Sequence, residues 1–306
     1  MSAPILVIVG PSASGKSALA VELAERLGGE IVGADSVQIY RRFDIGSAKP
    51  TRAERERVPH HLIDALDALD PADAARFLEL ADERLADIQR RGKRAIVCGG
   101  TFLWVKALIY GLAQAPPADA AIRARHRELA ERFGRPHLHA LLEPIDPASH
   151  ARLNPNDLVR VSRALEVHEL TGQALSQVQA AHGFKAPRHG VKLLGITHAR
   201  PALHERIERR VREMFEAGWL DEVRGLLADG YGEARALRSV GYRQVTEALL
   251  AGEQHEREPL IERVVVATRS FVRHQMTWLR DQPVEWLEPS GLDDYCARLQ
   301  REASAY

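Results

Sequence analysis

Cysteine is scarce in this chain of 306 residues, which contains only Cys98 and Cys296. Two cysteines exclude a disulfide scaffold and a zinc site with four cysteine ligands. Net charge is also absent, because 42 Lys and Arg balance 42 Asp and Glu, so no global basic field indicates a nucleic-acid partner. No apolar stretch approaches the ~20 residues of a membrane span, and the first residues lack the pattern of a signal peptide. We therefore expect a soluble cytoplasmic protein with no membrane attachment.

The chain has the length of about two domains, and 45% of its residues are apolar, which suffices for a buried core. Five short apolar runs, rich in β-branched residues, predict strands that are buried on both faces. These runs cover residues 5–9, 31–34, 94–98, 192–197 and 284–287. Helical patterns lie between them, at residues 17–27, 72–90, 103–112 and 200–228. Strands that alternate with helices predict an α/β fold, a parallel sheet flanked by helices.

The alternation of strands and helices stops between residues 117 and 190. This segment has no strand pattern, is bounded by proline-containing stretches, and holds seven of the 13 histidines. We expect an all-helical insertion domain at 117–190, and a core formed by 1–116 and 191–306 that ends in helices. The histidines at 137, 139, 150 and 168 show no metal-ligand spacing and are interpreted as ordinary.

A phosphate-binding motif follows the first predicted strand. The residues that match G-x-x-x-x-G-K-[ST] are Gly10, Pro11, Ser12, Ala13, Ser14, Gly15, Lys16 and Ser17. A buried strand before the motif and an amphipathic helix after it are the context of a P-loop. The backbone N–H groups, the helix N-terminus and Lys16 would bind a polyphosphate or diphosphate, and Ser17 is the expected Mg²⁺ ligand. The motif therefore predicts a P-loop NTPase-like sheet.

The second acidic site of a P-loop NTPase is harder to find in this sequence. Such proteins normally hold Mg²⁺ with an acid at the end of a buried strand. The strand at 94–98 is followed by Gly99, Gly100 and Thr101, and Asp64 follows only a short apolar run. Asp35 is better placed, since it comes just after the second predicted strand, at the edge where ligands bind in such sheets. An acid there can hold a metal, cap a helix or act as a base.

Further segments occur in a characteristic order along the chain. They are DSVQIY (35–40), DIGSAKP (44–50), PHHLID (59–64), GGTFLW (99–104), PAD (117–119), NPND (154–157), RALEV (163–167), SVGYRQ (239–244) and QMTWLR (275–280). Together with the P-loop, this series closely resembles the bacterial tRNA dimethylallyltransferases, also called tRNA isopentenyltransferases or the IPP transferase family. The resemblance extends from residue 5 to about residue 286.

The resemblance implies a specific reaction. The dimethylallyl group of dimethylallyl diphosphate would be transferred to N6 of the adenosine immediately 3′ of the anticodon, in tRNAs that read codons beginning with U. Diphosphate would be released, so the P-loop would hold that group with Mg²⁺ and no nucleoside triphosphate would be consumed. The missing second acid is then understandable. The implied partners are dimethylallyl diphosphate and the anticodon stem-loop of tRNA, and we expect a monomer without an obligate protein partner.

Three residues are candidates for the chemistry. An exocyclic amine is a poor nucleophile and needs a base within hydrogen-bond reach, and the catalytic aspartate that the resemblance implies falls on Asp35. Thr101 would donate a hydrogen bond near the reacting atoms or merely cap the next helix. Arg123 would stabilise the leaving diphosphate or be one of several solvated arginines.

Contacts with tRNA are expected from several segments. The segment 35–38 would line the side of a channel that the flipped adenosine enters. Arg273 and Arg280 lie on one helical face, which would contact phosphates or be simply solvated, and Trp278 would stack on a base or belong to the core. Family members often have glutamine where this chain has Val159. The full candidate set is Asp35, Ser36, Val37, Gln38, Thr101, Arg123, Val159, Arg160, Val161, Ser162, Arg163, Arg238, Ser239, Val240, Gly241, Tyr242, Arg243, Arg273, His274, Gln275, Met276, Thr277, Trp278, Leu279 and Arg280.

Two other functions are compatible with a P-loop. An ATP-dependent kinase for a small molecule or nucleoside would bind ATP at Lys16 and transfer a phosphoryl group. An RNA-binding P-loop protein would use its nucleotide site only for regulation. Transfer of a prenyl label to tRNA, without consumption of ATP, distinguishes the prenyltransferase from both.

Overall fold

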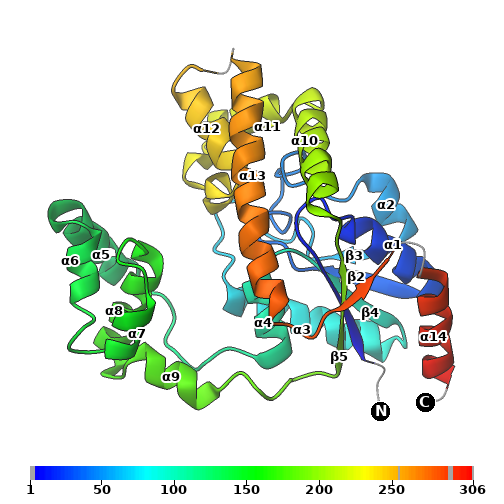
Figure 1. Cartoon of the computed structure of the whole chain (residues 1–306), viewed down its shortest axis with the longest axis horizontal. Coiled ribbons are helices and arrows are strands. Elements are labelled where there is room, and N and C mark those ends of the chain that lie inside the picture. Colours follow the sequence, from blue (N-terminus) through cyan, green and yellow to red (C-terminus); the bar gives the residue numbers. More distant parts are fainter. Residues whose placement is uncertain (1–3, 254–255, 289–291, 305–306) are drawn as a thin grey trace. The chain divides into compact units, whose positions relative to one another are not determined.

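The computed structural model describes residues 4–253, 256–288 and 292–304. The chain forms two compact units, one of Met1–Ile109 with Arg188–Tyr306 and one of Tyr110–Pro187 (Figure 1). We call the first the core unit and the second the helical unit. Each unit has a hydrophobic cluster of its own.

The core unit contains a six-stranded parallel sheet with the strand order β3-β2-β4-β1-β5-β6. The strands are β1 (Ile5–Val9), β2 (Gly29–Gly33), β3 (His60–His61), β4 (Arg94–Cys98), β5 (Val191–Ile196) and β6 (Glu285–Leu287). The predicted α/β class with a parallel sheet is confirmed. All five apolar runs form strands, whereas β3 was not expected because two histidines carry no strand pattern.

The central strand explains why its sequence is apolar on both faces. β1 pairs with β4 on one side and with β5 on the other, with Leu6 opposite Ile96 and Lys192. All five residues of β1 are buried. A strand in this position has no solvent-facing side, so alternation of apolar and polar residues is lost.

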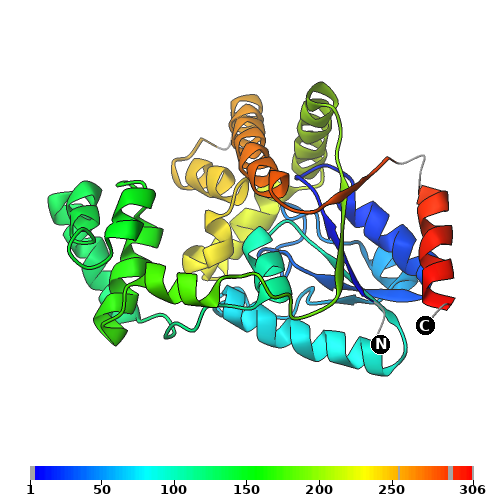
Figure 2. The ribbon, with the colours of Figure 1, turned by 60° about the horizontal axis from the view of Figure 1, so that its bottom comes forward.

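Helices cover both faces of the sheet. The helices outside the helical unit are α1 (Lys16–Leu27), α2 (Arg52–Arg57), α3 (Ala74–Arg90), α4 (Phe102–Tyr110), α10 (Arg200–Glu216), α11 (Trp219–Ala228), α12 (Tyr242–Leu250), α13 (Arg257–Arg280) and α14 (Leu292–Ser304). Two 3₁₀ turns, η1 (Tyr231–Glu233) and η2 (Arg235–Arg238), precede α12. α1 and α14 pack together on the face that carries Leu6 and Ile8, and α3 lies along the other face (Figure 2). α10 and α13 run side by side (Figure 1).

The prediction of one helix over residues 200–228 is wrong. The structure has two helices, α10 and α11, because Gly218 adopts a left-handed conformation with φ of 98° between them. This conformation favours glycine and breaks the helical hydrogen-bond ladder. The break turns the chain so that Trp219, the first residue of α11, is buried.

The helical unit is fully described and contains helices without a strand. They are α5 (Ala120–Phe133), α6 (Arg135–Ala140), α7 (Pro147–Arg152), α8 (Leu158–Thr171) and α9 (Leu175–His182). Their apolar faces meet around Leu138, Val161 and Leu165. His139 is buried and donates from Nε2 to the carbonyls of His150 and Leu153, at 3.0 and 3.1 Å. In the described parts of both units, no three His, Cys, Asp or Glu side chains gather as metal ligands do.

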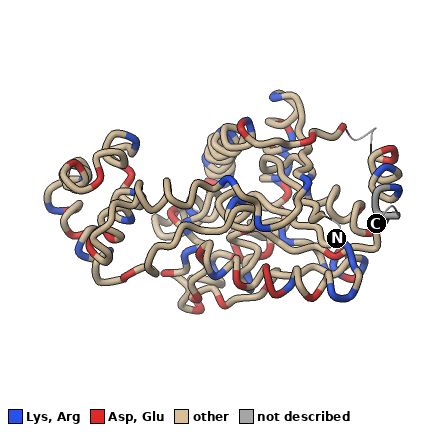
Figure 3. The backbone as a smooth tube through the Cα atoms, turned by 90° about the horizontal axis from the view of Figure 1, so that it is seen from below, with Lys and Arg blue, Asp and Glu red and all other residues tan. Residues whose placement is uncertain are grey.

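Charged residues of both signs are interspersed along the backbone (Figure 3). Many of the arginines form ion pairs with acids on the same or the neighbouring turn, such as Arg76 with Glu79 and Arg224 with Asp221. Exposed pairs of this kind contribute little to stability. None of the helices in the described ranges is long and apolar enough to span a bilayer.

Candidate functional site

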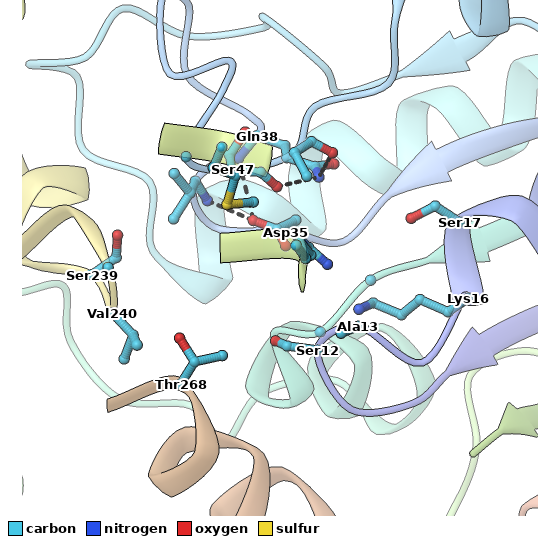
Figure 4. A pocket seen from close by; sticks show the side chains of 18 of the residues that line it. Ser12, Ala13, Lys16, Ser17, Asp35, Gln38, Ser47, Ser239, Val240 and Thr268 are labelled. Carbon is cyan, nitrogen blue, oxygen red and sulfur yellow. Dashed lines mark hydrogen bonds between the residues drawn. The ribbon is translucent and has the colours of Figure 1, made fainter. Parts of the chain in front are cut away.

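A cavity of about 820 Å³ opens at the carboxyl edge of the sheet (Figure 4). Its walls come from the segments that follow β1, β2 and β4, and from α10 and α13. Because the strands are parallel, these three segments emerge at the same edge. Asp35 lies between the side of the P-loop, with Lys16 and Ser17, and the side of Ser239 and Val240 (Figure 4). All lining residues belong to the core unit.

The P-loop adopts a conformation suited to an anion. Ala13 and Gly15 have φ values of 64° and 97°, and α1 begins directly after them. A loop whose successive residues switch between the ordinary and the left-handed backbone conformation points its N–H groups into one concave surface. The first N–H groups of a helix have no hydrogen-bond partner within the helix. A Cβ atom at Gly10 would lie 2.8 Å from the carbonyl oxygen of Ile196, so the loop also needs glycine where it leaves β1.

Two side chains from beyond β5 hold the backbone of the P-loop. Arg206 donates from Nε to the carbonyl of Ala13 at 2.8 Å, and His198 donates from Nε2 to the carbonyl of Ser14 at 2.9 Å. These two bonds fix the backbone of the P-loop at Ala13 and Ser14. The sequence interpretation missed both residues, although their position after a predicted parallel strand places them at the ligand-binding edge.

Positive charge converges on the cavity. Burial lowers the pKa of Lys16, and the nearby Arg210 acts in the same direction. Burial lowers the pKa of Arg210 as well, against the opposing effect of Asp35. Burial and the repulsion between Lys16 and Arg210 each disfavour their charged forms. A bound anion would stabilise both charges. Arg210, which the sequence interpretation also missed, is therefore a candidate phosphate ligand.

Asp35 uses one carboxylate oxygen for structure. Its Oδ1 accepts hydrogen bonds from the backbone N–H groups of Val37 and Gln38, at 2.9 and 3.2 Å. Among the described residues, no protein donor contacts Oδ2. Asp35 thus caps a turn with one oxygen and presents the other to the cavity that it lines.

The strand end at β4 is joined closely to the Asp35 segment. Thr101 accepts at Oγ1 from the N–H of Ser36 at 3.0 Å and donates to Ser36 Oγ at 3.1 Å. A Cβ atom at Gly99 would lie 2.0 Å from the carbonyl oxygen of Ala34. The hydroxyl of Thr101 therefore holds the Asp35 segment in place, and Gly99 permits the close approach of the two backbones.

Asp64, the weaker candidate for a second acid, is taken up by ion pairs. Its carboxylate contacts Lys49 Nζ at 2.6 Å and an Arg55 nitrogen at 2.8 Å. Burial by itself would raise the pKa of Asp64, but the hydrogen bonds and ion pairs with Lys49 and Arg55 together outweigh burial and lower it. It is not among the residues that line the cavity.

The candidate tRNA residues of α13 lie on two faces. Gln275 is buried and accepts at Oε1 from the N–H of Ser12 at 2.9 Å, while its Nε2 donates to the carbonyl of Gly100 at 3.2 Å. Trp278 stacks on Phe102 with ring centroids 4.4 Å apart. Leu279 is buried and Met276 half-buried, whereas Arg273, His274, Thr277 and Arg280 are exposed. Gln275 and Trp278 thus tie α13 to the P-loop and to the start of α4.

The predicted tRNA-binding residues around Gly241 also differ in whether they line the cavity. Ser239, Val240 and Gly241 line the cavity, together with Arg238, which is exposed. The ring of Tyr242 is buried, and Arg243 is exposed. Tyr242 also lines the cavity, whereas Arg243 is not among its lining residues.

Arg123 is engaged within the helical unit. It donates to the buried carboxylate of Glu166 with Nε at 2.8 Å and a terminal nitrogen at 2.9 Å. Arg163 contacts the same carboxylate and the carbonyl of Pro116. Burial alone would raise the pKa of Glu166, but the two arginines and the N–H of Asp119 hold it at about 2.

The remaining candidates of the helical unit lie on α8. Val159 and Arg160 are exposed, and Arg160 pairs with Asp157 at 2.7 Å. Val161 and Ser162 are buried, and the hydroxyl of Ser162 contacts Nδ1 of His126 at 2.9 Å. Val159 and Arg160 are therefore the accessible members of this segment, while Val161 and Ser162 pack inside the unit.

The parallel sheet, the P-loop and the cationic cavity define this chain as a P-loop α/β protein. The family model described as IPP transferase matches residues 38–282. The chain is 58% identical over 283 residues to the tRNA dimethylallyltransferase of Sorangium cellulosum (strain So ce56), which covers 92% of this chain and 90% of that protein. It is 47% identical over 292 residues to that of Geobacter metallireducens, which covers 95% and 94%.

Solved structures agree with these relatives. The crystal structure of the full-length tRNA isopentenylpyrophosphate transferase from Bacillus halodurans has 32% identity and a TM-score of 0.70, covering 99% of this chain and 98% of that one. A eukaryotic dimethylallyltransferase acting on tRNA has 26% identity and a TM-score of 0.76, covering 91% and 70%. The chain belongs to the IPP transferase family.

Proposed function

We propose that this chain transfers the dimethylallyl group of dimethylallyl diphosphate to N6 of the adenosine 3′ of the anticodon, in tRNAs that read codons beginning with U. The observation that carries the proposal is one cavity lined both by a P-loop and by Asp35. This arrangement suits a reaction between a diphosphate ester and an amine that arrives from the other side. Membership of the IPP transferase family and the names of close relatives support it.

The diphosphate is bound by the P-loop side. Lys16, Arg210 and the N–H groups at the start of α1 stabilise the negative charge that grows as the allylic C–O bond breaks. Apolar side chains of the same cavity, including Ile207, Met214 and Phe271, give room for the five-carbon group.

The residues also fit a magnesium ion. Ser17 is exposed, stands in the first turn of α1 and lines the cavity, so its hydroxyl oxygen would hold Mg²⁺ together with oxygens of the diphosphate and water. When bound, Mg²⁺ would neutralise charge on the leaving diphosphate.

Asp35 acts as the base. The N6 lone pair forms the new N–C bond at the allylic carbon, and the electron pair of the broken C–O bond leaves with diphosphate. The proton of N6 goes to Asp35 Oδ2, the oxygen without a protein donor among the described residues. Thr101 positions the Asp35 segment through Ser36. The role of Arg123 in stabilising the leaving group stays a proposal, since in the helical unit this side chain pairs with Glu166.

The tRNA is bound by exposed residues of both units. Arg273 and Arg280 on α13, Arg238 and Arg243 beside Gly241, and Arg160 on α8 would contact phosphates, which determine affinity rather than sequence preference. We propose that the chain acts as a monomer. A tRNA substrate supports a cytoplasmic location.

The kinase alternative is not favoured. The relatives named above are transferases acting on tRNA by name, and the acid expected beside the P-loop of a kinase is absent after β4. The RNA-binding alternative with a regulatory site does not account for Asp35 in the same cavity as the P-loop.

The test is a transfer assay. Protein, Mg²⁺, labelled dimethylallyl diphosphate and unmodified tRNA are incubated with and without ATP. We expect label in the RNA, one diphosphate released per transfer, and no requirement for ATP. If ATP is consumed and no label enters the RNA, the proposed prenyl transfer is refuted and the kinase alternative is supported.

A further inference from the structure

One part of the cavity wall is built around a tryptophan. We call residues 43–50 the Gly46 loop. The indole of Trp219 is buried between this loop and the start of α12, since a Cβ atom at Gly46 would lie 2.0 Å from its Nε1 and one at Gly241 would lie 2.4 Å from Cη2. Glycine is required on both sides because the ring occupies the space of a side chain. Gly46, Trp219 and Gly241 all line the cavity.

One carboxylate from α11 holds the backbone of the Gly46 loop. Glu222 accepts at Oε2 from the N–H groups of Asp44 and Ile45, at 2.9 and 2.6 Å, and at Oε1 from that of Gly46 at 3.3 Å. Tyr242 donates its hydroxyl to Oε1 at 2.6 Å. Burial raises the pKa of Tyr242 well above its usual value, so this hydroxyl keeps its proton.

The other side of the same loop is held by a buried lysine. Lys49 donates from Nζ to the carbonyl of Tyr40 at 2.8 Å and contacts the carboxylates of Asp44 and Asp64, both at 2.6 Å. The loop is therefore fixed from two directions, by Glu222 and by Lys49. Its carbonyl groups have one defined position in the cavity wall.

These carbonyls orient the amide of Gln38. Nε2 of Gln38 donates to the carbonyl oxygens of Ser47 and Ala48, at 3.0 and 3.1 Å (Figure 4). Carbonyl oxygens only accept, so the amide cannot be turned over, and both hydrogens of Nε2 are used. Oε1 then remains as an acceptor, and among the described residues no protein group donates to it. Gln38 follows Asp35 in the same turn, and both line the cavity.

We propose that Glu222 is a positioning residue that makes Gln38 selective for the amino group of the target adenine. This inference rests on the proposed function. On its base edges adenine carries one hydrogen-bond donor group, the 6-amino group, with two hydrogens. One hydrogen goes to Asp35 Oδ2 and the other to Gln38 Oε1. A purine with an oxygen at C6 places an acceptor against an acceptor and is rejected.

The test measures recognition without the reaction. The probes are two anticodon stem-loop RNAs that differ at the target nucleoside, adenosine in one and purine riboside, which lacks the 6-amino group, in the other. The readout is the ratio of their dissociation constants. The wild-type protein prefers adenosine, and Gln38→Ala reduces this preference by about five- to tenfold, the effect of one hydrogen bond. Glu222→Ala reduces it to the same extent.

The two changes should not add, because Glu222 acts through Gln38. The double variant therefore keeps the ratio of either single variant. Asp221→Ala is the matched control. It removes the neighbouring acid of the first turn of α11, whose carboxylate pairs with Arg224 on the surface, and it leaves the ratio unchanged.

Three results would overturn the inference: an unchanged ratio in Glu222→Ala, an unchanged ratio in Gln38→Ala, or additive effects. If Glu222→Ala does not fold, Glu222→Gln replaces it, since the amide keeps one accepting oxygen for the loop. A wild-type protein that prefers adenosine but transfers no dimethylallyl group would refute the proposed function instead. If the wild type transfers the dimethylallyl group, but Gln38→Ala and Glu222→Ala keep the wild-type ratio of dissociation constants, only this inference is refuted.

Discussion

Single atoms decide the geometry of the cavity at several positions. Oδ1 and Oδ2 of Asp35 differ, since the first caps a turn and the second faces the cavity. The placement of Asp35 after the second strand was readable from the sequence, because parallel strands end at one edge. The division of its two oxygens was not readable, because it depends on the turn that Val37 and Gln38 form.

Glycine at position 99 is a second case at this scale. In Gly99→Ala, the new Cβ atom meets the backbone of Ala34 and forces the segments after β2 and β4 apart. We expect a loss of about 1–3 kcal/mol in unfolding free energy and a large loss of transfer activity. Gly225→Ala is the control, since nothing lies within 4 Å of its added atom, and helix propensity should stabilise it slightly. Denaturant unfolding measures both, and equal stability of the two variants would contradict the account.

The lowered pKa of Glu166 makes the stability of the helical unit depend on pH. Its pKa is about 2, below the ordinary 4.5. A carboxyl with a depressed pKa contributes stability that is complete above pH 4.5 and is lost as the pH falls through about 2. Glu166→Gln should therefore lower the protection of α5 and α8 amides from hydrogen exchange at pH 7, and the difference from wild type should shrink toward pH 2. Glu143→Gln, at an exposed position, is the control. Protection that falls equally in wild type and Glu166→Gln between pH 4.5 and 2 would count against this role.

Elements were predicted well where periodicity is strong. All five apolar runs became strands, and the P-loop took its expected place between β1 and α1. The break between α10 and α11 escaped prediction, because the apolar pattern continues through Gly218. His198 and Arg206 escaped because their partners at the P-loop lie 184 and 193 residues away in the chain, and periodicity carries no information on such contacts.

The sequence predicts that Gln275 and Arg273 of α13 both contact tRNA, but the structure separates them. Gln275 holds the P-loop, whereas Arg273 lies on the exposed face. Gln275→Ala removes the link between Ser12 and Gly100 and leaves the Ser12 N–H without its acceptor. We expect the KM for dimethylallyl diphosphate to rise about tenfold, with an unchanged salt dependence of tRNA binding. Arg273→Ala is the matched variant on the exposed face, where we expect a salt slope reduced by about one and an unchanged KM for the diphosphate.

The two measurements on α13 are steady-state kinetics and tRNA binding at several salt concentrations. The interpretation fails if Gln275→Ala changes only the salt slope, or if Arg273→Ala changes only the KM for the diphosphate. Either result would assign the two faces of the helix the opposite way.

At the scale of the whole molecule, the residue where the chain leaves the core unit lies next to the residue where it returns. The N–H of Arg188 donates to the carbonyl of Ile109 at 2.7 Å, and each unit has its own hydrophobic cluster. Replacing residues 110–187 by a short Gly/Ser linker should therefore leave the core unit folded. We expect diphosphate binding within about threefold of wild type and a loss of at least about tenfold in tRNA affinity. Calorimetry with diphosphate and tRNA measures both, and full retention of tRNA affinity would exclude the helical unit from the interface.

The central claim is that Asp35 takes the proton of an adenosine amine while the P-loop holds the leaving diphosphate. Asp35→Asn tests it most directly, because the amide oxygen can still accept from Val37 and Gln38 and preserve the turn. The measurement is the single-turnover rate of dimethylallyl transfer to tRNA, with tRNA affinity measured on the same variant. We predict a rate lower by about 10²–10⁴-fold, the contribution of a positioned base, with tRNA affinity reduced by no more than about tenfold, the effect of one hydrogen bond. A rate close to that of the wild type would contradict the account.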